Sequence, residues 1–176
     1  MPLARLAQRS LAALALGVAL SLPALPAAAE SLGTFKDWTA HELEVEGQTI
    51  CFMESRPTAL APKPADREAA DVRVTITHRP SRSIRHALVF ETGYALDPDV
   101  LAVITIDGNP YAMGTDAEGY FYVTKTEDER KLIDAMKGGR KLIAKGVMQD
   151  GTPIEDAYSL SGFTAAMKAI DQACPE

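Results

Sequence analysis

The two cysteines constrain the fold of this chain more than any other feature, because Cys51 lies near its start and Cys174 lies two residues from its end. Two cysteines allow one intramolecular disulfide, which would enclose most of the chain and contribute about 4–5 kcal/mol in the chain-entropy model. The alternatives are free thiols or a metal site, which two thiols and three scattered histidines support poorly. In an exported protein an even number of cysteines favours the disulfide. We therefore predict that Cys51 and Cys174 are bonded.

The N-terminal residues have the pattern of a secretory signal peptide. Two arginines precede an uncharged apolar run at residues 11–22, and an A-x-A pattern ending at Ala29 offers a cleavage site before Glu30. A membrane-spanning helix needs roughly 20 apolar residues, so this run is too short to span a bilayer. The sequence predicts a cleaved leader at residues 1–29 and a single domain at residues 30–176. We expect a periplasmic or secreted location and no membrane span after cleavage.

The predicted mature domain is acidic. The chain has 18 Lys and Arg against 24 Asp and Glu, and two arginines lie in the leader, which leaves 16 against 24 and a net charge of −8. That charge disfavours nucleic acid or an anionic membrane as a general partner. It is also an ordinary charge for a soluble protein.

Most of the mature sequence has the pattern of short β-strands. Residues 72–77 alternate strictly between apolar and polar side chains, which is typical of a half-buried strand. Similar segments follow one another between turn signals such as Asp150-Gly151, and they predict roughly eight or nine short strands in a sandwich or barrel. Residues 57–70 contain three prolines among alanines and charged residues, which predicts a flexible surface loop.

Two segments predict α-helices. The first begins at Thr126, with Glu129 in capping-box spacing, and ends at Gly138. The second is C-terminal and carries one continuous apolar stripe, formed by Phe163, Met167, Ile170 and Cys174. This stripe places Cys174 on the buried face of the helix. The simplest assembly lays the C-terminal helix across the first hairpin, where Cys51 lies.

Three motifs cover most of the predicted mature domain. The first is DWTAHELEVEGQTICFMESRP (residues 37–57), a tryptophan strand followed by a Cys-containing strand that ends in Ser-x-Pro. The second is VTITHRPSRSIRHALVFETGY (residues 74–94). The third is EDAYSLSGFTAAMKAIDQAC (residues 155–174), in which D-x-Y-S-L-x-G-F precedes a helix ending in Cys. On these motifs the chain resembles the two-cysteine branch of the invasion-associated locus B family, exported proteins of Gram-negative bacteria.

The resemblance implies a fold and a setting. The fold would be mainly β, an immunoglobulin-like β-sandwich of roughly eight or nine short strands with two α-helices, one of them C-terminal. The setting would be export, with an association with host-cell invasion or envelope stress. The family as a class implies no enzymatic activity.

The segment HRPSRSIRH, residues 78–86, is the candidate interaction loop. It contains no acidic residue, and its basic and imidazole side chains are His78, Arg79, Arg82, Arg85 and His86. Arginine presents a rigid fork of donors that suits carboxylate, sulfate or phosphate, so we predict an exposed loop that docks an acidic protein, a glycan or another envelope component. The alternatives are arginines that are solvated or paired with nearby acids. The two histidines, without a carboxylate near them, make at most a weak metal site.

The sequence contains none of the catalytic motifs G-x-S-x-G, H-E-x-x-H or a Gly-rich phosphate loop. We assign no catalytic, cofactor or metal-binding residue, and we predict a non-enzymatic exported protein that binds an unidentified partner. The alternative is an envelope hydrolase, or a protein resembling an enzyme inhibitor, with a site assembled from distant residues. A polar pocket with converging His, Asp or Glu side chains would favour that alternative.

Overall fold

The computed structural model describes residues 29–62 and 72–175, so the predicted signal peptide lies outside the described residues except for Ala29. The strands are β1 (Glu30–Phe35), β2 (Trp38–Val45), β3 (Gln48–Ser55), β4 (Ala59–Ala61), β5 (Arg73–Arg79), β6 (Ile84–Glu91), β7 (Ala102–Ile106), β8 (Asn109–Thr115), β9 (Tyr120–Tyr122), β10 (Lys141–Val147) and β11 (Pro153–Ser159). The helices are the 3-10 helix η1 (Pro80–Arg82) and the α-helices α1 (Thr126–Gly138) and α2 (Phe163–Ala173). Neither α-helix is long and apolar enough to cross a membrane.

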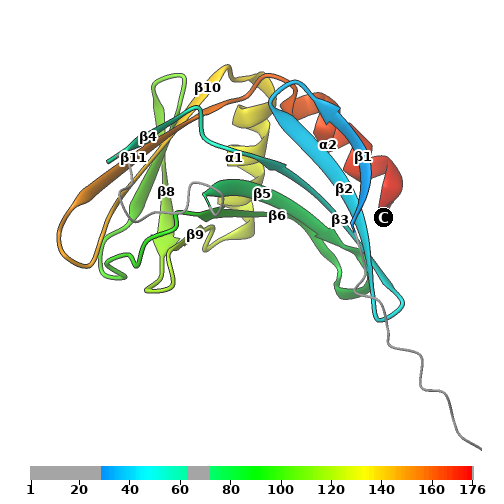
Figure 1. Cartoon of the computed structure of the whole chain (residues 1–176), viewed down its shortest axis with the longest axis horizontal. Coiled ribbons are helices and arrows are strands. Elements are labelled where there is room, and N and C mark those ends of the chain that lie inside the picture. Colours follow the sequence, from blue (N-terminus) through cyan, green and yellow to red (C-terminus); the bar gives the residue numbers. More distant parts are fainter. Residues whose placement is uncertain (1–28, 63–71, 176) are drawn as a thin grey trace, which may run out of the picture.

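The strands form one bent antiparallel sheet with the order β1-β2-β3-β5-β6-β9-β8-β7-β10-β11-β4. Figure 1 shows β1, β2 and β3 with α2 on one side, β4, β8, β10 and β11 on the other, and α1 between them. The two sides are joined through β9, which pairs with both β6 and β8. This is the predicted mainly β architecture with two helices, one of them C-terminal. The two groups of strands have a sandwich-like arrangement.

The described residues contain more strands than the eight or nine predicted. Strand β1 has the sequence ESLGTF, which lacks regular alternation, and its pairing with β2 is interrupted between Ser31 and Gly33. Strand β4 has only three residues and pairs with β11 at one edge of the sheet. Because Ala59–Ala61 forms this strand, the prediction of a loop throughout 57–70 was wrong there. Residues 63–70 of that prediction lie outside the described residues.

The core is built from the inward faces of the strands. Strand β5 shows the predicted alternation, with Val74 and Ile76 fully buried and the polar residues Arg73, Thr75 and Thr77 half-buried. Trp38 of β2 is also fully buried, and its indole N–H donates to the carbonyl oxygen of Ser159 at 3.0 Å. Its ring packs edge-on against Phe163, with ring centroids 5.0 Å apart. A buried indole needs such an acceptor, so Trp38 connects β2 with both β11 and α2.

Helix α2 packs against β1, β2 and β3, as its apolar stripe predicted. The buried residues of the helix are Phe163, Ala166, Met167 and Ile170. Gly162 precedes the helix with a φ of 96°, and a Cβ atom there would overlap the carbonyl oxygen of Phe35. Only glycine combines this left-handed backbone with so close an approach, so Gly162 allows α2 to begin directly against β1.

The disulfide bond joins β3 to the end of α2. Cys51 and Cys174 are bonded, with their Cα atoms 5.9 Å apart and a sequence separation of 123 residues. Both side chains are buried, at 0% and 1% exposure. The predicted pairing is therefore confirmed, and it attaches the last helix to one of the first strands.

Helix α1 has the predicted bounds but not the predicted N-terminal cap. Its N-cap is Lys125, and no side chain caps the first turn. The carboxylate of Glu129 instead accepts a hydrogen bond from the backbone N–H of Leu88 on β6, at 3.1 Å. Strand β9 pairs with β6 only as far as Val89. The next residue of β6 is Leu88, and Glu129 serves as the acceptor for its backbone N–H. The capping-box prediction was wrong because this tertiary contact takes the carboxylate.

Candidate functional site

The connection between β5 and β6 is only partly exposed. Residues 80–84, which include η1, are exposed, and Arg79 is half-buried. His78 is only 1% exposed, while Arg85 and His86 are half-buried. The prediction of an exposed loop is therefore wrong for His78 and only partly right for Arg79, Arg85 and His86, which are half-buried. His78, Arg85 and His86 face the end of α2.

A β-bulge directs two of these side chains. The register between β5 and β6 shifts after Thr77, so that two residues of β6, Arg85 and His86, lie opposite His78 alone. His86 has a left-handed φ of 61°, a conformation in which histidine is enriched among non-glycine residues. In a regular strand neighbouring side chains point to opposite faces. The bulge allows Arg85 and His86 both to reach the end of α2.

Asp171 of α2 meets these side chains, and we call His78, Arg85, His86 and Asp171 the Asp171 cluster. The Oδ1 atom of Asp171 accepts a hydrogen bond from Nη2 of Arg85 at 2.9 Å. The same oxygen lies 3.6 Å from Nε2 of His78 and 3.6 Å from Nε2 of His86. Arg85 also donates from Nη1 to the carbonyl oxygen of Cys174 at 3.2 Å. The cluster therefore links the β5–β6 bulge to the last turn of the chain.

Sequence reasoning missed Asp171, although a signal for it existed. Asp171 lies one helical turn before Cys174, and Cys51 lies directly opposite His78 in the β3–β5 pair. The predicted disulfide, combined with the register of β3 and β5, would bring Asp171 close to the two histidines. Our interpretation that His78 and His86 have no nearby carboxylate was wrong for this reason.

Burial lowers the pKa of both imidazoles of the cluster and so favours their neutral form. The pKa of His78 is lowered to about 4, mainly by burial. The positive charges of His86 and Arg85 lower this pKa further, and the negative charge of Asp171 raises it. Burial also lowers the pKa of His86, against the attraction of Asp171. A neutral imidazole keeps one nitrogen lone pair free to accept a hydrogen bond or bind a metal ion. Among the described residues, neither ring nitrogen of His78 has a hydrogen-bond partner.

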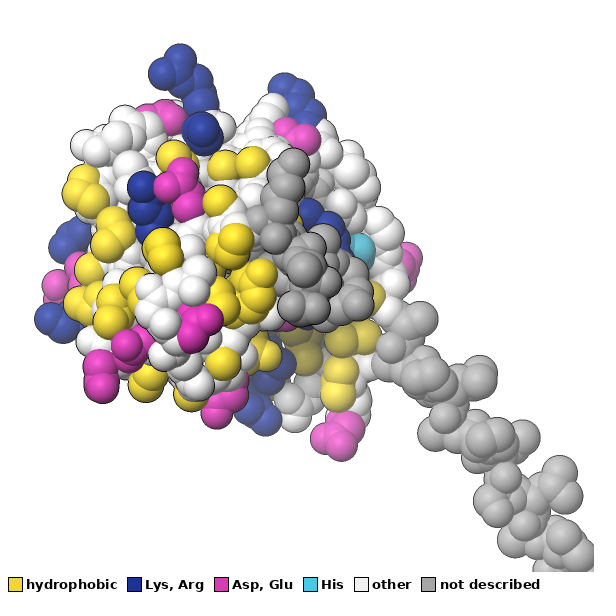
Figure 2. Space-filling view, turned by 60° about the vertical axis from the view of Figure 1, so that its left-hand side comes forward, with side chains coloured by type: hydrophobic (Ala, Val, Ile, Leu, Met, Phe, Trp, Pro, Cys, Tyr) yellow, Lys and Arg dark blue, Asp and Glu magenta, His cyan; other side chains and the backbone are white. Residues whose placement is uncertain are grey.

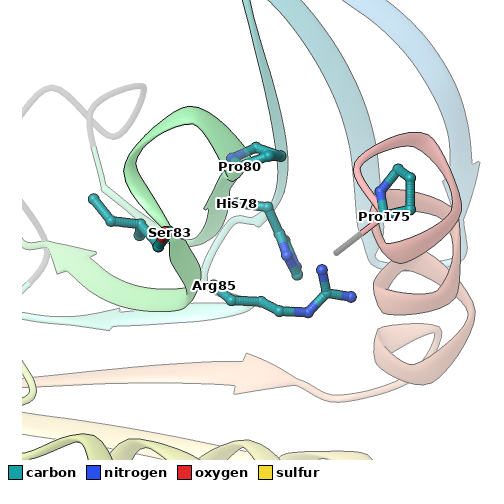
Figure 3. Close-up of a pocket in the computed structure, with 6 residues that line it drawn as sticks. His78, Pro80, Ser83, Arg85 and Pro175 are labelled. Atoms are coloured by element: carbon teal, nitrogen blue, oxygen red, sulfur yellow. The ribbon is translucent and has the colours of Figure 1, made fainter.

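A cleft of about 310 Å³ lies beside the Asp171 cluster. Its lining residues are His78, Pro80, Ser83, Ile84, Arg85 and Pro175. Figure 3 shows the side chains of His78 and Arg85 pointing toward the end of α2, where Pro175 forms the opposite wall. The walls are largely apolar, and the imidazole and guanidinium groups supply polar atoms. This combination of apolar walls and few polar groups is typical of a ligand site.

The three arginines of the candidate interaction loop have different roles. Arg85 bonds to Asp171 and to the backbone of Cys174, so it holds the chain end. Arg82 is exposed and lies with Pro80 in η1. Arg79 is half-buried and directly precedes Pro80 in the sequence. Arg82 is therefore the only one of the three arginines that is exposed.

The remaining surface mixes apolar and charged side chains. Figure 2 shows hydrophobic side chains interspersed with acidic and basic ones on the face that comes forward from the left of Figure 1. The large hydrophobic residues exposed among those described are Val45, Ile84, Leu101, Val103, Tyr120 and Tyr122. Singly exposed apolar residues are ordinary on protein surfaces. The cleft beside the Asp171 cluster is therefore the stronger candidate for a functional site.

Together these features define a class of protein: a mainly antiparallel β domain whose C-terminal helix is disulfide-bonded to its third strand. The chain belongs to the invasion associated locus B (IalB) protein family, whose model matches residues 38–171. The matched range includes Trp38, Cys51 and all members of the Asp171 cluster. The family predicted from the sequence motifs is therefore confirmed.

A solved structure has the same fold. It is the crystal structure of invasion associated protein B from Bartonella henselae, similar to this chain with a TM-score of 0.54 and 13% sequence identity. The match covers 85% of this chain and 99% of that chain. At this identity the likeness concerns the fold alone. No curated protein matches this chain.

Proposed function

We propose that this chain is an exported protein of the cell envelope that binds a partner through the cleft beside the Asp171 cluster and catalyses no reaction. The observation that carries this proposal is the cleft, in which the apolar walls of Pro80, Ile84 and Pro175 meet the polar atoms of His78 and Arg85. Ligand sites combine apolar walls with a few placed polar groups in this way.

Export is supported by the covalent chemistry of the domain. A buried disulfide between Cys51 and Cys174 is expected to persist in an oxidising compartment such as the periplasm or the extracellular medium. The predicted leader at residues 1–29 leads to the same location. The description of the family as invasion associated supports host-cell interaction as the setting of this binding. Envelope stress is the second setting that we propose.

The partner that we propose carries an acidic group. Arg82 is exposed and Arg79 half-buried next to the cleft, in a chain with a formal net charge of −6. Guanidinium groups bind carboxylate, sulfate or phosphate through two parallel hydrogen bonds. A protein, a glycan or another envelope component with such groups fits this surface. Arg85 contributes to the wall of the cleft but is already bonded to Asp171.

The proposal is tested by affinity capture from envelope extracts with mature protein (residues 30–176) and the double variant Arg79→Ser/Arg82→Ser. We expect the wild type to retain an envelope component in a salt-sensitive manner and the variant to lose most of it. We expect a nearly unchanged melting temperature, because exposed charges contribute little to stability.

The matched control is Arg130→Ser/Arg140→Ser, which removes the same charge from exposed arginines on α1 and directly after it. Capture by this control should equal that of the wild type. Equal losses in both double variants would mean that total charge drives binding, and undiminished capture by Arg79→Ser/Arg82→Ser would contradict the proposed surface.

One observation favours the alternative function, an envelope hydrolase. His78, His86 and Asp171 converge although they are distant in sequence, which is the arrangement expected for a site assembled from separate elements. Two observations weigh against catalysis: His78 is 1% exposed, and Arg85 already occupies the carboxylate of Asp171. Hydrolysis of ester, phosphate or glycoside substrates by the wild type, abolished in Asp171→Asn, would support the hydrolase instead.

A further inference from the structure

The Asp171 cluster brings three metal-binding atoms together. Nε2 of His78, Nε2 of His86 and Oδ1 of Asp171 all lie within 4.8 Å of one another. Two of the three separations, from each imidazole to the carboxylate oxygen, are 3.6 Å. Nitrogen ligands lie about 2.0–2.1 Å from a tetrahedral zinc ion, so two ligand atoms of one ion are about 3.3–3.4 Å apart. Side-chain adjustments on the order of 1 Å would therefore bring the three atoms around one ion.

The state of His78 is independent evidence for a missing partner. Its side chain is 1% exposed, and neither of its ring nitrogens has a hydrogen-bond partner among the described residues. A buried polar group without a partner is costly, and an ion bound at Nε2 would satisfy that nitrogen while Nδ1 carries the ring proton.

The backbone supports the same arrangement. His86 reaches the cluster only because the bulge places it beside Arg85, opposite His78, with a left-handed φ of 61°. Unfavourable backbone conformations of this kind persist where the surrounding structure holds them, and they concentrate at functional sites. Bulges re-aim side chains next to such sites.

We propose that His78, His86 and Asp171 bind one divalent transition-metal ion. Two imidazoles and one carboxylate suit zinc and its neighbours copper and nickel better than magnesium or calcium, which prefer oxygen ligands. Arg85 shares Oδ1 of Asp171 and therefore competes with the ion for this oxygen. The site is independent of the partner proposed above.

The position of the ion deepens the proposed function. His78 is both a ligand and a lining residue of the cleft, so the ion would lie at the inner wall of the cleft. Three protein ligands leave a tetrahedral ion one position for water or another ligand. An acidic group of the partner would fit that position, and this step alone rests on the proposed function.

Metal binding is tested by calorimetry with zinc chloride and untagged, chelator-treated protein (residues 30–176). We expect one ion per chain, a raised melting temperature with zinc, and the visible absorption of a tetrahedral site with Co²⁺. His86→Ala and Asp171→Asn should each weaken zinc binding by more than about tenfold. These two ligands are half-buried, so the test does not depend on a variant of buried His78.

Two further variants test which side chains control zinc binding. His41→Gln removes the histidine outside the cluster and should leave zinc affinity unchanged. Arg85→Gln should bind zinc more tightly, because it removes the competing cation; unchanged or weaker binding would contradict the shared use of Oδ1. Absence of stoichiometric binding, or equal binding by His86→Ala, Asp171→Asn and the wild type, would overturn the proposal. Partner capture that persists in chelator without zinc would contradict ligation of the ion by the partner, and it would leave both the proposed function and the metal site standing.

Discussion

Replacement of both cysteines by alanine tests how the disulfide stabilises the domain. The bond spans 123 positions, and a loop of this length is worth about 5 kcal/mol in the chain-entropy model. Native disulfides typically contribute about 2–5 kcal/mol, so we expect Cys51→Ala/Cys174→Ala to lose that amount of unfolding free energy. For a domain of this size the loss corresponds to a melting temperature lower by about 4–20 °C.

The folded structure should survive the double replacement. Helix α2 keeps its buried contacts through Phe163, Met167 and Ile170, so most of the helix stays on the sheet. The last turn loses its covalent attachment, and the amides near Asp171 and Cys174 should exchange faster with solvent. Unfolding can be followed in urea by the fluorescence of Trp38, the only tryptophan.

Reduced wild-type protein is the control for this experiment. It lacks the bond but keeps both sulfur atoms, so the difference between it and the double variant measures only the packing of two buried sulfur atoms. We expect that difference to be on the order of 1–2 kcal/mol. If the reduced wild type loses less than about 1 kcal/mol relative to the oxidised form, restriction of the unfolded chain is not what the disulfide contributes, and our reasoning is refuted.

Four other predictions follow from single contacts. Gly162→Ala should lower the unfolding free energy by more than about 2 kcal/mol, because its Cβ would overlap the carbonyl oxygen of Phe35. The control Gly151→Ala has a φ of 85° and open space around it, so it should cost only about 1 kcal/mol in thermal unfolding. Glu129→Ala should lose about 1–3 kcal/mol because it leaves the N–H of Leu88 unpaired, while Glu129→Gln keeps an acceptor. Burial raises the folded-state pKa of Glu129 above its ordinary value of 4.5, so ionisation of this carboxyl destabilises the fold. The wild type should therefore lose stability relative to Glu129→Gln as the pH rises from about 4.5 through the raised pKa. A difference in unfolding free energy that stays constant with pH in urea would contradict this. Trp38→Phe should lose about 1–3 kcal/mol by leaving the carbonyl of Ser159 without its donor, measured by circular dichroism because the variant has no tryptophan.

Local patterns in the sequence predicted the main elements of the fold. Alternation identified β5, because one of its faces is buried and the other is half-exposed. The stripe through Phe163 and Ile170 identified the face that α2 buries, and the cysteine at its end identified the strand on which the helix lies. Strands β1 and β4 were not predicted, since one lacks regular alternation and the other has only three residues.

The candidate site was predicted only in part, because its geometry depends on contacts between distant residues. The sequence indicated the segment with His78, Arg85 and His86 from its composition. The bulge at His86 leaves no local pattern, and Asp171 is one of many acidic residues until the disulfide places it. Glu129 shows the same limit, since its spacing predicted a cap and its carboxylate instead bonds to a neighbouring strand.

The bond between Cys51 and Cys174 closes residues 51–174 into a covalent ring, from which β1, β2 and the start of β3 extend as a tail. A protease that cuts one peptide bond inside this ring opens it but releases no fragment. Both halves remain attached, so their effective concentration stays high and the sheet can close again around the nick. A single cleavage between these cysteines would therefore leave α2 and Asp171 tethered to β3.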